Sequence, residues 1–190
     1  IGGASADEHF LVKHKHKKIN KYYPGLSLLW LPFFALAHAF ALVFHFPANG
    51  FSLPYQWGLG CASLFYLFLG LFYLRKFIFK FSSRAWIALL VPILLFYGTP
   101  LFEFAINLNS LSHVYSFCVI TVFTYYAFRF LNEEENKLYH FCLSLLLFAV
   151  LVSIRPLNAL VLLVLPALAL HKNKFKWATV LKPGFVHLML

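Results

Sequence analysis

The chain has 190 residues, of which 62% are hydrophobic, 20% are aromatic and only 12% are charged, and its formal net charge is +10 at pH 7. Soluble domains carry about 25% charged residues and still expose about a third of their chain surface, so this much Phe and Leu excludes a water-soluble fold. The basic residues lie in short connections beside apolar stretches, where charge sorting across a membrane explains them. A nucleic-acid partner is therefore not expected.

Six apolar stretches follow one another along the chain, and residues on all sides of each are apolar. They are 25–46, 57–74, 85–101, 114–131, 138–154 and 156–171. Backbone groups in lipid need internal partners, so only helices or a closed barrel span a membrane, and barrel strands would alternate apolar with polar residues. Most stretches reach or approach the ~20 residues that a helix needs to cross ~30 Å of hydrocarbon. The sequence predicts an all-α polytopic transmembrane bundle of five to six helices.

The connections between these stretches differ in charge. Lys and Arg gather in four places, at 13–21, 75–84, 129–137 and 172–182. The links 47–56 and 98–113 hold no base, and Arg155 is the one base between the fifth and sixth stretches. If all six stretches cross, one side collects 15 of the 16 basic residues. Basic loops face the cytoplasm, so this arrangement places Arg155 and the two uncharged links on the outer face.

The first stretch, 25–46, has two interpretations. Ser27, His38 and His45 are 11 and 7 residues apart, so at about 100° per residue they fall within about 20° of one line along a helix. Such a polar stripe suits a span that faces its neighbours or a helix that lies in the membrane interface. If the stretch does not cross, residues 1–24 change sides and the tally becomes 10 basic residues inside and 6 outside. The charge rule alone prefers crossing.

The link 98–113 carries a first set of candidate site residues. Glu103 precedes His113 by ten residues, and the polar residues between them are Asn107, Asn109, Ser110 and Ser112. An acid and an imidazole at one membrane face could hold a metal ion or position a hydroxyl nucleophile. The alternative is a solvated loop in which a Ser or Asn caps the next helix.

Arg155 is the second candidate, because it lies between two apolar stretches on the side that is poor in bases. A charge at the bilayer centre costs about 2.5–3.5 kcal/mol on insertion scales, so the guanidinium should reach the interface or find an anion. A lipid phosphate, which a guanidinium binds bidentately, is one partner. The alternative is an arginine that extends to the headgroups without a specific ligand.

Residues 1–24 offer weaker signals. Asp7 and Glu8 are the one acidic pair before the first stretch and could supply a general base, although most such pairs are merely solvated. His14 and His16 could chelate a metal, but the lysines among them oppose this and favour a solvated or headgroup-binding segment. Tyr22, like other aromatic residues near the first two stretches, is typical of an interfacial belt, with a sugar platform as the second interpretation.

Four segments follow one another in the order NKYYPGLSLLWLPFFALAHAFA, ANGFSLPYQ, LNSLSHVYSF and AVLVSIRPLNALVLLVLP. Together they resemble a bacterial group of multi-spanning GT-C-type glycosyltransferases, and the arrangement covers most of the chain, residues 20–170. Similar proteins include the dolichyl-phosphate mannosyltransferases and the lipid A aminoarabinose transferases. The resemblance implies an enzyme of the bacterial inner membrane that takes a sugar from a polyprenyl-phosphate carrier and gives it to an acceptor on the outer face.

The resemblance also implies roles for individual residues. Arg155 corresponds to a basic residue near the donor phosphate, and His113 lies in the loop where relatives carry a polar or acidic residue near the donor. Binding roles follow for Glu103, Asn109, Lys21 and Tyr22. Asp7 and Glu8 lie in what would be the rest of the catalytic loop, which leaves open whether one of them is the catalytic acid or whether that residue lies upstream.

Three expectations about organisation follow from the same resemblance. Residues 1–24 would be the remnant of a polar external loop, and residues 25–190 a transmembrane domain that is incomplete at both ends. The stretch 25–46 would be a juxtamembrane helix on the outer face. A divalent metal could assist the departing phosphate. The alternatives without transfer chemistry are a transporter or flippase-like protein and a structural membrane subunit.

Overall fold

The computed structural model describes residues 11–14, 17–20, 23–133 and 135–170. The elements are β1 (Leu11–His14), β2 (Lys17–Asn20), α1 (Gly25–Val43), α2 (Leu53–Ile78), α3 (Ala85–Gly98), α4 (Leu101–Ile106), α5 (His113–Asn132), α6 (Lys137–Ile154), the 3-10 helix η2 (Pro156–Leu163) and α7 (Val164–Leu170). The expected all-α bundle is confirmed. A small antiparallel hairpin, in which β1 pairs with β2, precedes it and was not expected from the sequence.

Four of the described helices, α1, α2, α5 and α6, are long and apolar enough to cross a membrane. The chain is accordingly a membrane protein. The third and sixth apolar stretches differ from the expectation. The third forms α3, with 14 residues, which ends before Thr99-Pro100, and the six-residue α4 follows in what was expected to be a link. At 1.5 Å per residue α3 is about 21 Å long, which is too short to cross ~30 Å of hydrocarbon unaided.

The sixth stretch is not a continuous α-helix. Pro156 has no backbone N–H and cannot continue the hydrogen-bond ladder of α6. The chain breaks at Arg155, which is extended with φ −152°, and restarts as η2 before α7. The Leu151 carbonyl near the end of α6 accepts the Arg155 backbone N–H at 3.2 Å and also the side-chain amide of Asn158 at 3.1 Å. The second hydrogen bond ties η2 to the end of α6.

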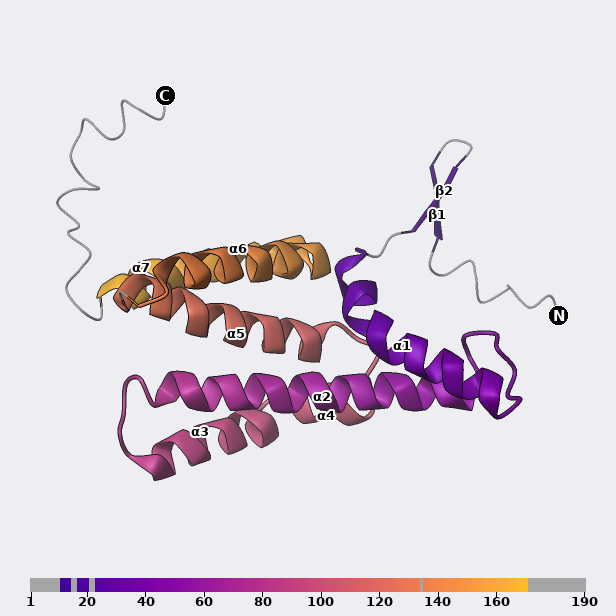
Figure 1. Ribbon diagram of the computed structural model, residues 1–190, viewed down its shortest axis with the longest axis horizontal. Coiled ribbons are helices and arrows are strands. Elements are labelled where there is room, and N and C mark those ends of the chain that lie inside the picture. Colours follow the sequence, from indigo (N-terminus) through magenta and orange to yellow (C-terminus); the bar gives the residue numbers. More distant parts are fainter. Residues whose placement is uncertain (1–10, 15–16, 21–22, 134, 171–190) are drawn as a thin grey trace.

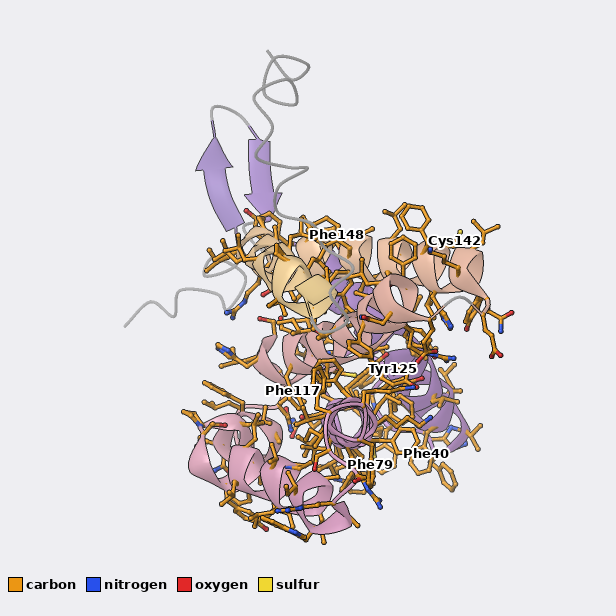
Figure 2. The ribbon with its side chains drawn as sticks, turned by 90° about the vertical axis from the view of Figure 1, so that its left-hand side faces the viewer. Phe40, Phe79, Phe117, Tyr125, Cys142 and Phe148 are labelled. Atoms are coloured by element: carbon orange, nitrogen blue, oxygen red, sulfur yellow. The ribbon has the colours of Figure 1, made fainter. Side chains whose placement is uncertain are left out.

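Helix α5 is the centre of the bundle, between α6 on one side and α2 on the other (Figure 1). One cluster of buried side chains, which includes Phe123 and Leu151, joins α5 to α6, η2 and α7, and a second, which includes Leu67 and Val114, joins α5 to α2 and α4. Gly70 lets α2 approach α5 closely, because a Cβ there would overlap the Phe117 ring. Figure 2, which looks along the bundle, shows Phe117 between α5 and α2.

The bundle has two ends, which we name by one residue each. The Glu133 end holds the connections 79–84 and 133–136, and the Arg155 end holds the start of α5 and the break between α6 and η2 (Figure 1). The connections rich in basic residues therefore lie at one end of the bundle, and the connections poor in basic residues lie at the other. The described bases of α2, α5 and α6 fall at the Glu133 end.

Helix α1 starts at the Arg155 end and extends away from the bundle. Gly25 packs so closely on the Ser153 backbone at the end of α6 that a Cβ would overlap it. From there α1 runs antiparallel along the first half of α2, where the Tyr66 hydroxyl donates to the Leu29 carbonyl at 3.1 Å, and the pair projects past α5 and α6 (Figure 1). By length and composition α1 could span a membrane, so both interpretations of 25–46 stay predictions.

Candidate functional site

Arg155 lies where α6 ends and η2 begins, and its side chain is exposed. Among the residues that the structure describes, none forms a hydrogen bond or an ion pair with its guanidinium. An arginine side chain carries five N–H donors in a fixed fork. This group is therefore free to bind an anion at the end of the bundle.

His113, the first residue of α5, lies at the same end of the bundle as Arg155. After burial, the positive charge of Arg155 is the second influence on the His113 imidazole, so two of the residues that the sequence singled out lie within electrostatic range of each other. The imidazole is half-buried and stacks on the Phe104 ring of α4, with ring centres 4.0 Å apart and an angle of 17° between the planes. This stacking fixes the imidazole at the mouth of the bundle.

Asn158 and Ser116 extend the polar cluster inward, and the sequence analysis did not select either as a site residue. The Asn158 amide donates to the Ser116 hydroxyl at 3.1 Å and thus links η2 to α5. Asn158 lies in the 3-10 helix η2 and Ser116 in the α-helix α5, and no local sequence pattern signals that the two side chains meet.

Glu103 does not join His113 as the sequence suggested. Its carboxylate accepts a 2.8 Å hydrogen bond from the Asn107 side chain within the same exposed segment. The main-chain carbonyl of Asn109 accepts from the Tyr115 hydroxyl at 3.1 Å. Glu103 and Asn109 thus lie in the connection at the Arg155 end, but no described hydrogen bond joins either to His113 or Arg155.

No group of three His, Cys, Asp or Glu side chains that could hold a metal ion occurs in the described part of the chain. The residues present there do not supply the donor set that the expected divalent metal would need. Asp7, Glu8, Lys21 and Tyr22 lie outside the described residues, as does His16.

The aromatic residues near this end have two different roles. Trp57 is 56% exposed, as expected of an interfacial belt. Trp30 instead packs edge-on against the buried Tyr115, with ring centres 6.1 Å apart, and Tyr66 packs on the same ring at 5.4 Å. These contacts fasten α1 and α2 to the start of α5. The buried Tyr115 ring is not available as a sugar platform.

Two apolar grooves open on the helices, and neither contains the polar cluster. One, of about 250 Å³, lies between α1 and α2 beside Phe33 and Trp57. The other, of about 290 Å³, lies between α5, α6, η2 and α7 beside Phe123 and Phe148. The second groove is lined in part by α6 and η2. Arg155 lies between these two helices, and Asn158 lies in η2. Comparison of the chain with known protein families, with curated proteins and with solved structures found no match.

Proposed function

We propose that this chain is a glycosyltransferase of the bacterial inner membrane. It takes a sugar from a polyprenyl-phosphate-linked donor and transfers it to an acceptor at the outer face. The observation that carries the proposal is the exposed guanidinium of Arg155, which has no partner among the described residues and lies within electrostatic range of His113 where two apolar helices meet. A lipid-linked phosphate combines the anion that this group binds with a chain that dissolves in the membrane.

The reaction would be an inverting displacement at the anomeric carbon of the sugar. A carboxylate takes the proton of the acceptor hydroxyl, and the acceptor oxygen forms its bond to this carbon while the bond from the carbon to the phosphate oxygen breaks. The electron pair of that bond leaves with the polyprenyl phosphate. Arg155 stabilises the negative charge that develops on the phosphate, which is the kind of interaction that accelerates the step.

The residues of the Arg155 end divide the remaining tasks. Asn158 and Ser116 link η2 to α5 and so hold Arg155 at the mouth of the bundle. Glu103 lies in the short helix α4, while Asp7 and Glu8, which lie in what the resemblance makes the rest of the catalytic loop, are outside the described residues. No step is assigned to a metal ion. The membrane itself raises the effective concentration of the lipid-linked donor.

A transporter is the less supported alternative. Transporters bind their substrates near the bilayer midplane, at helices that are interrupted there. The break between α6 and η2 instead lies at an end of the bundle, and the charged residues of the described helices also lie toward the ends. Chemistry at the membrane surface agrees better with this distribution than an ion-coupled pathway does.

The test is transfer from a radiolabelled polyprenyl-phosphate sugar by the full-length protein in proteoliposomes. We expect Arg155→Ala to reduce transfer by about 100-fold, the usual effect of removing one group that stabilises developing charge. Arg155→Lys should retain part of the activity, because an ammonium supplies charge without the bidentate geometry.

Arg75→Ala is the matched control, because Arg75 is an exposed arginine at the opposite end of the bundle. It should leave transfer unchanged. Membrane insertion, measured by alkaline extraction, should be normal in all three variants. Undiminished transfer by a normally inserted Arg155→Ala protein would contradict the proposal.

A further inference from the structure

Acidic residues are absent from a long part of the chain. No Asp or Glu occurs between Glu8 and Glu103, so α1, α2, α3 and their connections contain none. Within this part, Arg75 and Lys76 lie in the last turn of α2, and Arg84 immediately precedes α3. All three side chains are exposed at the Glu133 end of the bundle. We call residues 75–86 the α2–α3 turn.

The neighbouring bases at this end already have a carboxylate partner. Glu133 forms ion pairs with Lys80 at 2.7 Å and with Arg129 at 2.6 Å, one through each of its carboxylate oxygens. No described carboxylate lies within ion-pair distance of Arg75, Lys76 or Arg84. The α2–α3 turn therefore presents three positive charges that the described part of the chain does not neutralise.

Two of these cations form cation–π contacts with aromatic rings. The Arg75 guanidinium lies 5.6 Å from the centre of the Phe79 ring, and the Lys76 ammonium lies 4.5 Å from that of Phe72. These contacts favour one position for each cation. Phe79 is 40% exposed, and Trp86, at the start of α3, is 59% exposed. Basic residues beside exposed aromatic rings are typical of a segment at the level of lipid headgroups.

We propose that the α2–α3 turn binds the phosphate groups of anionic phospholipids in the leaflet at the Glu133 end. The anionic headgroup supplies the negative charge that this half of the chain lacks, and the exposed rings enter the boundary between headgroups and hydrocarbon. This lipid site lies at the opposite end of the bundle from Arg155. It does not depend on the proposed transferase activity.

The test measures which lipids the full-length protein retains. Protein purified from bilayers of equal phosphatidylglycerol and phosphatidylcholine is examined by native mass spectrometry. We expect the wild-type protein to retain phosphatidylglycerol preferentially. In the triple variant Arg75→Gln/Lys76→Gln/Arg84→Gln the ratio of retained phosphatidylglycerol to phosphatidylcholine should be about tenfold lower, since each basic residue near a membrane surface adds to the attraction for anionic lipid.

The matched control keeps every charge and exchanges the residue types, as Arg75→Lys/Lys76→Arg/Arg84→Lys, and should retain the preference. Size-exclusion elution and helical circular dichroism report whether each variant is folded. If the triple glutamine variant is not folded, the single variant Arg84→Gln is measured instead, because it breaks neither cation–ring contact. It should show a smaller loss of the preference for phosphatidylglycerol. An unchanged preference in the folded glutamine variants would overturn the proposal. Complete displacement of the lipid by inorganic phosphate or by an acidic peptide would also overturn it, because the site would then serve soluble anions or proteins.

Discussion

Glu133 and Arg155 show two different uses of charge at the two ends of the helical bundle. At the Glu133 end one carboxylate joins Lys80, which follows α2, to Arg129 of α5, with contacts of 2.7 and 2.6 Å. At the Arg155 end the exposed guanidinium has no ion pair among the described residues, although its charge acts on His113. The Glu133 pairs hold parts of the chain together. Arg155 keeps its charge available.

This difference separates two reasons for placing an arginine beside a membrane. The Lys80–Glu133 pair ties the connection after α2 to the end of α5, and the Arg129–Glu133 pair lies within the end of α5, which is a structural use. Arg155 lies at a helix break, where its position is fixed by Pro156 and by the Asn158 amide rather than by a partner for its charge. A cation that is held in place but not neutralised is the arrangement that an anion-binding site requires.

The largest expected effect concerns the side of the membrane that each end faces. In a variant whose three native cysteines are replaced, Ser110→Cys at the Arg155 end should react with an impermeant maleimide added to intact cells. Ser83→Cys at the Glu133 end should react only after the membrane is permeabilised, because basic connections face the cytoplasm. Both serines are exposed, so accessibility in the protein is matched. Labelling of Ser83→Cys from outside would reverse the assignment of the two ends.

The second prediction breaks the contact that attaches α1 to the Arg155 end. A Cβ at Gly25 would overlap the Ser153 backbone, which cannot move aside as a flexible side chain can. Gly25→Ala should therefore lower the free energy of unfolding by about 1–3 kcal/mol, the usual cost of overpacking, measured by denaturant titration in mild detergent.

Gly98→Ala is the control, because no heavy atom lies within 4 Å of a Cβ at that position. It should leave stability unchanged or raise it slightly, since alanine restricts the unfolded chain. Equal destabilisation by both variants would show that the α1–α6 contact is not specific.

The sequence predicts the helices well because lipid imposes a strong composition on whatever crosses it. The stretch 138–154 differs from α6 by one residue at its start, and 114–131 differs from α5 by one residue at each end. The lengths of α3 and η2 are harder to predict from the sequence. Thr99-Pro100 and Pro156 interrupt runs that stay apolar on both sides. Proline has no backbone N–H to continue the helical hydrogen bonds, so the helix stops although the apolar sequence continues.

The site is less predictable, because its members meet only through packing. Arg155 stands out in sequence as a base between apolar stretches, and His113 as a polar residue at the mouth of a span. The pairing of Asn158 with Ser116 depends on the angle at which η2 returns along α5, which no local pattern encodes. The sequence could not show that Glu103 accepts a hydrogen bond from the side chain of Asn107, four residues away, and its predicted binding role stays a prediction.

The smallest expected effect tests the structural use of charge at the Glu133 end. Burial raises the pKa of the Glu133 carboxyl, but hydrogen bonds and charges from Lys80 and Arg129 outweigh this, and its pKa lies below the ordinary value of 4.5. The ionised group therefore favours the folded state at pH 7. Glu133→Gln should lower the free energy of unfolding there by about 0.5–1 kcal/mol, because the pairs are partly solvated.

The pH dependence fixes the sign of this effect. A carboxyl whose pKa is depressed by folding stabilises above the pKa of the unfolded chain and loses that contribution as the pH falls through the folded value. The stability difference between the wild-type protein and Glu133→Gln should thus be constant from pH 7 to pH 5 and shrink below about 4.5. In a Lys80→Met background the difference should be smaller at every pH, since one of the two pairs is already absent. A difference that persists undiminished at pH 3 would mean that Glu133 acts through packing, and the contrast between the paired cations Lys80 and Arg129 and the available charge would then rest on Arg155 alone.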